Sequence, residues 1–121
     1  MSERILLVDD HADIRMLIRI TLGTKFEVLE AADGVTALAI AREKRPRVVI
    51  LDAMMPGEMD GFQVLEAIRR DPALSDVRVM MVTARGQASD RDRGISLGAD
   101  EYFIKPFSPL QVGDAIRALV G

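Results

Sequence analysis

Five short apolar segments recur along the chain, and longer segments with helical spacing separate them. The apolar segments are Ile5–Val8, Phe26–Leu29, Val48–Leu51, Val77–Thr83 and Tyr102–Ile104. The run Val48–Leu51 shows no polar alternation, which is typical of a strand covered on both faces. Strands that alternate with helices form a parallel sheet with helices on both sides. The order of the segments therefore predicts an α/β fold with five strands and five helices.

The spacing of apolar residues predicts one buried face in the first and last helices. The face of the first helix comprises Ile14, Leu17, Ile18 and Leu22, and that of the last comprises Val112, Ile116, Leu119 and Val120. Helix starts are indicated by residues that cap N-termini, namely Asp33, Asp60 and Ser108. Ser89 with Asp92 resembles a capping box at another start. Together these signals predict where the helices begin and which sides they bury.

Composition limits the kinds of protein that this chain resembles. Its 121 residues are enough for one domain, which we expect to span residues 1–121. The net charge of −3 argues against binding to nucleic acid. The apolar run near the N-terminus is too short for a signal peptide or a membrane span. With no cysteine, the chain has the composition of a cytoplasmic protein without a membrane segment.

Three of the predicted strands run directly into residues that carry charge. Ile5–Val8 leads into Asp9 and Asp10, Val48–Leu51 leads into Asp52, and Tyr102–Ile104 leads into Lys105. In a parallel sheet the carboxyl ends of the strands lie together, where open α/β folds bind their ligands. Three carboxylates and one ammonium group at this edge predict a site for a divalent cation and a phosphoryl group.

Several motifs, in the order that the family has them, resemble the receiver domain of bacterial two-component response regulators. They are Asp9-Asp10, Asp52, Met55-Pro56, Asp60-Gly61, Thr83-Ala84, Gly98-Ala99-Asp100 and Lys105-Pro106-Phe107. The resemblance covers about residues 3 to 120. It implies a doubly wound sheet in the order 2-1-3-4-5, which is a flavodoxin-like three-layer sandwich. It also implies a cis peptide bond before Pro106.

The resemblance implies a phosphorylation-activated switch in phosphorelay signal transduction. Asp52 would accept a phosphoryl group from the phosphohistidine of a sensor histidine kinase or a phosphotransfer protein. A carboxylate that attacks phosphorus becomes an acyl phosphate. Lys105 and the hydroxyl of Thr83 would stabilise the charge on the transferred group. The domain would not be an enzyme beyond catalysing its own phosphorylation and dephosphorylation.

The acidic cluster needs a cation because carboxylates about 4 Å apart repel by about 4 kcal/mol at an effective dielectric constant near 20. The oxygen ligands, with no histidine or cysteine expected nearby, favour Mg²⁺. By resemblance, Asp10 and Asp52 would bind the metal directly, together with the backbone carbonyl of Met54. Asp9 would act through a metal-bound water. The neighbouring His11 is interpreted as a solvated residue at the start of the first helix.

The resemblance also implies that phosphorylation changes one face of the domain. This face comprises the fourth helix, the fifth strand and the fifth helix, roughly residues 89–120. We expect Thr83 to move toward the phosphoryl group and Tyr102 to turn inward behind it. The face carries charges that would allow a weak phosphorylation-dependent homodimer, namely Arg91, Asp92, Arg93, Asp100, Glu101 and Arg117. The alternative is that the same face docks a different protein.

One departure and three alternatives accompany this interpretation. The family has two residues between its Met-Pro and Asp-Gly motifs, whereas this chain has Gly57, Glu58 and Met59. A flavin carrier is disfavoured because the acids after the first strand would repel its phosphate. An aspartate phosphohydrolase is disfavoured because Met54 stands where that family has its second acid. A receiver-like binding module that is never phosphorylated is the remaining alternative. The sequence does not identify the kinase, the stimulus, the output, the phosphoryl lifetime, or whether an effector domain follows residue 121.

Overall fold

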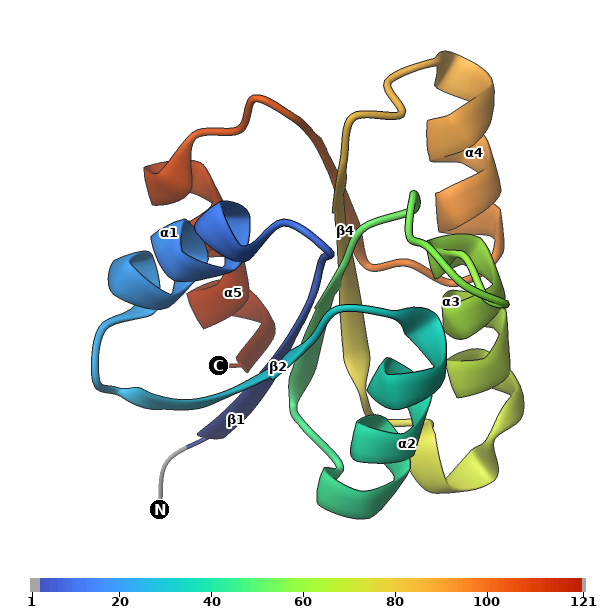
Figure 1. Cartoon of the computed structure of the whole chain (residues 1–121), viewed down its shortest axis with the longest axis horizontal. Helices are drawn as coiled ribbons and strands as arrows, with labels where there is room; N and C mark the ends of the chain where they lie inside the picture. The colour runs from blue at the N-terminus through green and yellow to red at the C-terminus, as the bar shows by residue number, and fades with distance from the viewer. Residues whose placement is uncertain (1–2, 121) are drawn as a thin grey trace.

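A five-stranded parallel sheet forms the centre of the protein (Figure 1). The computed structural model describes residues 3–120, so residues 1, 2 and 121 of the expected domain lie outside the described range. The strands are β1 (Glu3–Val8), β2 (Phe26–Ala31), β3 (Val48–Leu51), β4 (Arg78–Thr83) and β5 (Glu101–Ile104). Their order, β2-β1-β3-β4-β5, confirms the expected arrangement. Four strand boundaries differ from the sequence prediction by one to two residues.

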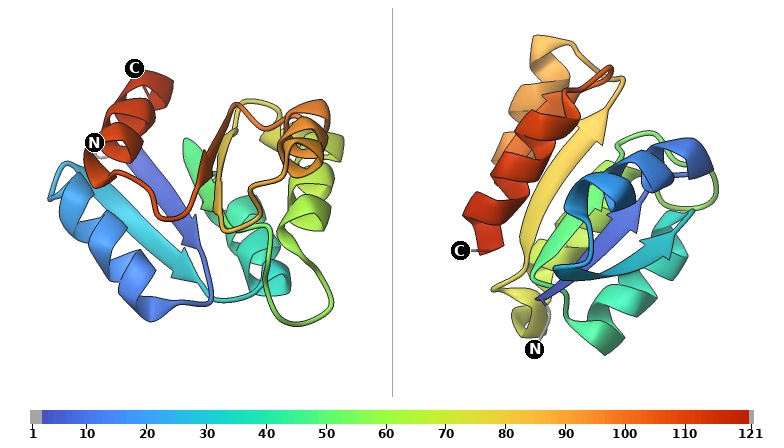
Figure 2. Two further views of the ribbon diagram at one scale, coloured as in Figure 1. Left: turned by 90° about the horizontal axis from the view of Figure 1, so that it is seen from above. Right: turned by 90° about the vertical axis from the view of Figure 1, so that its left-hand side faces the viewer.

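Five α-helices cover the two faces of the sheet within the described residues. They are α1 (Ala12–Leu22), α2 (Gly34–Lys44), α3 (Gly61–Arg70), α4 (Ala88–Ser96) and α5 (Pro109–Val120). A short 3₁₀ turn, Pro72–Leu74, follows α3. Figure 2 shows α1 and α5 together on one side of the sheet, with α2, α3 and α4 on the other. This confirms the predicted three-layer sandwich.

Each strand contributes alternate residues to two separate apolar cores. In β1, Leu6 and Val8 belong to the core beneath α2, α3 and α4, whereas Ile5 and Leu7 belong to the core beneath α1 and α5. All four are at most 1% exposed. The two-residue period of a strand therefore divides one continuous apolar run between both faces. Such a run has no solvent-facing side, which explains its lack of polar residues.

Three of the predicted helix caps are present, but the fourth is wrong. The carboxylates of Asp33 and Asp60 each accept a backbone N–H of the following helix, and Asp60 forms a capping box with Gln63. Ser108 Oγ accepts the N–H of Gln111 at 3.3 Å. Ser89, however, lies inside α4, whose N-cap is Gln87. The helix begins earlier than the capping pattern indicated because local side-chain signals alone do not determine its first turn.

The buried face of α1 is narrower than predicted. Ile18 and Leu22 are buried and Ile14 packs against the same core, but Leu17 is 40% exposed. Residues four apart form a single stripe along a helix, and Leu17 lies on the flank of that stripe. In α5 the predicted residues Val112 and Ile116 are buried, and Leu119 and Val120 are partly buried.

The loop between β3 and α3 has one residue more than the family pattern. It accommodates this residue by a turn at Gly57 and by packing of Met59 against the core. Gly57 has a φ of +92°, a conformation that favours glycine. Met59 packs against the core, where a Cβ on Gly34 would lie 2.7 Å from its carbonyl oxygen. The additional residue therefore changes the loop while Asp52 remains at the end of β3.

Gly61 allows the start of α3 to lie against the residue that follows β3. Its N–H donates to the carbonyl oxygen of Ala53 at 3.0 Å. A Cβ at Gly61 would collide with the carbonyl oxygen of Asp52. Only glycine therefore allows this approach without moving the backbone.

We predict that Gly61→Ala lowers the free energy of unfolding by about 1–3 kcal/mol, because the added methyl group overpacks a rigid backbone contact. Urea denaturation measures the loss. Gly86→Ala is the control, since a Cβ there would meet only the Ile104 side chain, at 3.1 Å, which can move. Equal destabilisation by both substitutions would contradict the proposed backbone collision.

Candidate functional site

The carboxyl ends of the strands bring charged residues together, as the sequence predicted. Asp9 follows β1, Asp52 follows β3, and Lys105 follows β5. Backbone hydrogen bonds extend the ladders through these positions: Asp52 N–H donates to the carbonyl oxygen of Val8 at 3.0 Å, and Lys105 N–H to that of Thr83 at 2.9 Å. The sheet itself therefore sets the positions of these residues.

Lys105 holds two buried carboxylates together. Its Nζ lies 2.7 Å from Asp9 Oδ2 and 2.8 Å from Asp52 Oδ2. Asp9 and Asp52 are only 5% and 3% exposed. Burial lowers the pKa of Lys105, but hydrogen bonds and attraction from both carboxylates outweigh it, so the pKa lies above its usual value. The Lys105–Pro106 peptide bond is cis, as expected.

Asp52 lies at the floor of an accessible cavity. Its Oδ1 accepts the N–H of Met54 at 2.9 Å, while Lys105 contacts its other oxygen. A cavity of about 450 Å³ opens beside it, lined by Asp10, His11, Asp13, Ile14, Asp52, Met54, Ala84 and Lys105. The Met54 side chain is 54% exposed at the rim of this cavity. A reactant can therefore approach a carboxylate that is otherwise almost fully covered.

Thr83 and Tyr102 are linked through the backbone of Arg85. The Arg85 N–H donates to Thr83 Oγ1 at 3.3 Å, and its carbonyl oxygen accepts the Tyr102 hydroxyl at 2.6 Å. Tyr102 is only 6% exposed, and burial is the main reason that its pKa is raised. Gly94 provides space, since a Cβ there would lie 3.0 Å from the ring. The ring therefore lies inward in this structure, and its movement upon phosphorylation stays a prediction.

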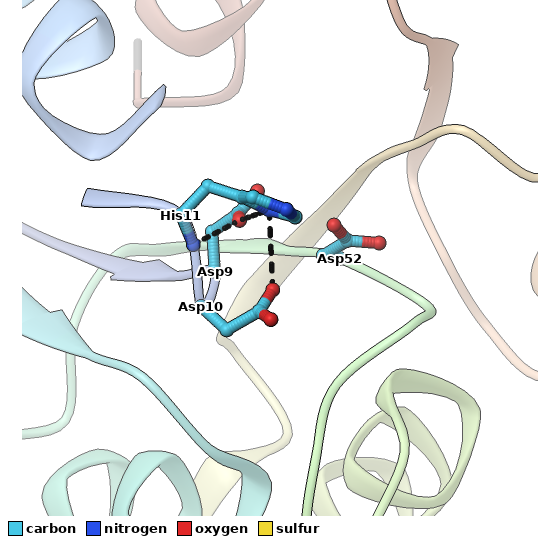
Figure 3. Close-up of side chains that lie close together, drawn as sticks. All are labelled: Asp9, Asp10, His11 and Asp52. Carbon is cyan, nitrogen blue, oxygen red and sulfur yellow. Dashed lines mark hydrogen bonds and ion pairs between the residues drawn. The ribbon is translucent and has the colours of Figure 1, made fainter. Parts of the chain in front are cut away.

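His11 is exposed at the N-cap of α1, as expected, and its ring also contacts the acidic cluster (Figure 3). Its Nδ1 lies 2.9 Å from Asp9 Oδ1 and 3.2 Å from Asp10 Oδ1, although its side chain is 59% exposed. The hydrogen bond from the ring to the Asp9 carboxylate is the main reason that the pKa of His11 is raised, followed by the charges of both acids. In the sequence, only the position of His11 directly after Asp9-Asp10 indicated these contacts.

The acidic residues fit a divalent cation better than they fit helix capping. The N-cap of α1 is His11, whose side chain makes no capping hydrogen bond. One ligand atom from each of Asp9, Asp10, His11 and Asp52 lies within 4.8 Å of the others. Carboxylate oxygens at this spacing suit Mg²⁺. The expectation that no histidine lies near the acids is therefore wrong.

We predict that the imidazole of His11 titrates above its ordinary pKa of 6.5, because Asp9 and Asp10 favour the protonated ring. The contribution of this contact to the stability of the folded protein is complete below the pKa of the unfolded-state imidazole. It is lost as pH rises through the higher pKa of the folded state. Proton NMR in the presence of a chelator measures the pKa of His11 directly, since the chain has one histidine. Asp9→Asn should lower the midpoint, whereas Asp33→Asn is a distant control. A wild-type midpoint at or below 6.5 would contradict this contact.

The chain is similar to response regulators in both its sequence and its structure. The family model of the response regulator receiver domain matches residues 5–117. Among curated relatives, ycf27 of Guillardia theta, named as a transcriptional regulator, is 44% identical over 98% of this chain and 46% of its own length. RpaA of Synechocystis, named as a DNA-binding regulator, is 39% identical over 97% of this chain and 48% of its own length.

The same likeness extends to solved structures. The chemotaxis response regulator CheY4 of Vibrio cholerae has a TM-score of 0.89 at 32% identity, and the match covers 98% of this chain and 99% of that one. The chain spans about half the length of the curated relatives it matches. The likeness therefore concerns one domain that these relatives contain.

Proposed function

Because the chain belongs to the response regulator receiver family, we propose that it accepts a phosphoryl group on Asp52 from the phosphohistidine of a sensor histidine kinase or a phosphotransfer protein. The contact of Lys105 Nζ with both Asp52 and Asp9 carries this proposal. It places a cation beside a buried carboxylate that faces a cavity. The competing interpretation as an unphosphorylated binding module is disfavoured, because the acids, Thr83 and Lys105 are all present.

In the proposed transfer, an Asp52 carboxylate oxygen attacks phosphorus while the bond from phosphorus to the donor imidazole nitrogen breaks. The product is an acyl phosphate on Asp52 and a free imidazole on the donor. Phosphoryl transfer depends mainly on positioning and on neutralising charge. Lys105 supplies a positive charge beside Asp52, and Thr83 supplies a hydroxyl at the end of β4. The same groups serve hydrolysis, so the domain catalyses only its own modification and its removal.

The acidic cluster supports Mg²⁺ as the cofactor of this reaction. Asp10 and Asp52 would hold the ion directly, together with the Met54 carbonyl, and Asp9 would hold it through water. The ion would neutralise charge on the transferred phosphoryl group. Asp10 is suited to this role because its carboxylate is 35% exposed toward the cavity, whereas those of Asp9 and Asp52 already contact Lys105.

We also propose that phosphorylation changes partner binding or dimerisation through α4, β5 and α5. Three of the six charges expected at a dimer interface have other contacts. Asp100 pairs with Arg69 at 3.0 Å, Arg117 pairs with Asp114 at 2.7 Å, and Arg93 lies over the ring of Phe62 at 4.3 Å. The proposal therefore depends on the other three expected charges, which are exposed: Arg91, Asp92 and Glu101.

The proposed activity belongs to residues 1–121 as one receiver domain. Their net charge of −3 gives no general attraction to the DNA backbone, so the DNA binding named for RpaA is not assigned to them. Within residues 3–120, every helix is too short or too polar to cross a bilayer. The cytoplasmic location stays a prediction.

We predict that acetyl phosphate with Mg²⁺ adds one phosphoryl group to the protein and that Asp52→Ala prevents it. Intact-mass spectrometry detects the adduct, and peptide mapping locates it. Asp60→Ala is the matched control, since Asp60 caps α3 and does not contact Lys105. Equal labelling of wild type and Asp52→Ala would place the phosphoryl group elsewhere.

We predict that beryllofluoride, which mimics a phosphoryl group, produces a weak dimer that high salt dissociates, because exposed ion pairs contribute only about 0–1 kcal/mol each. Sedimentation velocity at two salt concentrations measures it, with Asp52→Ala as the control. A monomer under all conditions would exclude the homodimer and favour docking of a different protein. A dimer that Asp52→Ala also forms would separate dimerisation from the phosphoryl site.

A further inference from the structure

The imidazole of His11 occupies a position that the proposed Mg²⁺ site does not use. Its Nδ1 faces Asp9 Oδ1 at 2.9 Å and Asp10 Oδ1 at 3.2 Å (Figure 3). Within the described residues, His11 is the one ion-pair partner of Asp10. The ring lines the same cavity as Asp52 and Lys105. A nitrogen donor therefore stands among oxygen donors at the reactive end of the sheet.

The spacing of these atoms matches adjacent ligands of one metal ion. Two ligands at right angles, each bound at about 2.0–2.2 Å, lie about 3 Å apart. The two distances from Nδ1 have this value, and the Asp52 carboxylate lies within 4.8 Å of all of these atoms. One nitrogen and two oxygens thus lie where they can bind one cation.

We propose that His11 is a metal ligand and that it makes this receiver site prefer a divalent transition-metal cation to Mg²⁺. The inference rests on the proposed function, because it concerns the same acidic site. Imidazole binds transition metals well, whereas Mg²⁺ prefers oxygen and keeps its waters. For a mixed nitrogen and oxygen site, affinity rises from Mn²⁺ through Co²⁺ to Ni²⁺.

The ligand assignment is consistent with how the cluster is held. Asp9 uses Oδ2 for Lys105. Its Oδ1, which would hold Mg²⁺ through water, faces His11 and would bind a transition metal directly. His11 N–H also donates to Asp9 Oδ1 at 2.9 Å, which fixes the backbone that carries the ring. The exposed part of the ring faces solvent, which leaves the remaining coordination positions to water or to a phosphoryl oxygen.

Cobalt(II) is the probe, and the full chain offers a clean signal because it contains one histidine and no cysteine. Calorimetry at one fixed pH compares Co²⁺ and Mg²⁺ binding to wild type, His11→Phe and Asp13→Asn. His11→Phe keeps a ring and removes the nitrogen. Asp13→Asn removes a charge from the same cavity and is the matched control. Proton NMR of wild type with Co²⁺ monitors the imidazole N–H for a paramagnetic shift.

The proposal requires tighter binding of Co²⁺ than of Mg²⁺ to wild type and a shifted imidazole N–H. It also requires that His11→Phe weaken the affinity for Co²⁺ about tenfold or more, while the affinity for Mg²⁺ changes less than about twofold. Unchanged Co²⁺ affinity in His11→Phe, or an unshifted imidazole, would overturn it. Asp13→Asn losing as much Co²⁺ affinity as His11→Phe would also overturn it, because net charge would then explain the effect. Absence of Mg²⁺ binding to wild type would instead contradict the metal part of the proposed function.

Discussion

The contact of one ammonium group with two buried carboxylates is the interaction around which this site is organised. Asp9 and Asp52 are held at the ends of neighbouring strands by ladder hydrogen bonds, so they cannot separate to relieve their repulsion. At a distance of about 4 Å and an effective dielectric constant near 20, that repulsion is about 4 kcal/mol. Lys105 offsets it from the end of β5, which connects the far edge of the sheet with its centre.

This arrangement would also connect the proposed reaction with a distant face. A phosphoryl group on Asp52 would change the charge beside Lys105. Thr83 is joined to Tyr102 through the backbone of one residue, Arg85: its N–H donates to the Thr83 hydroxyl and its carbonyl oxygen accepts the Tyr102 hydroxyl. Because Tyr102 packs closely against Gly94 of α4, a shift at the end of β4 would be transmitted to α4 by contact.

Tyr102 is placed to take part in the proposed switch. Its ring lies inward in this structure, where its hydroxyl donates to the Arg85 carbonyl oxygen. His11 adds a second refinement of the site, since it brings a nitrogen donor to a cluster otherwise made of oxygens. Both features concern side chains whose neighbours lie on other elements or in the same short turn, and neither alters the fold.

The sequence by itself determined the five strands, the strand order through its family motifs, and the convergence of Asp9, Asp52 and Lys105. These follow from backbone properties, because parallel strands necessarily bring their carboxyl ends to one edge. Only the tertiary structure decided the side-chain partners. Asp100, expected at a dimer surface, instead pairs with Arg69, 31 residues away. The ring of Tyr102 is buried, and the exposed ring of His11 contacts Asp9 and Asp10. Side-chain orientation depends on packing between distant segments, which periodicity and strand-end position do not encode.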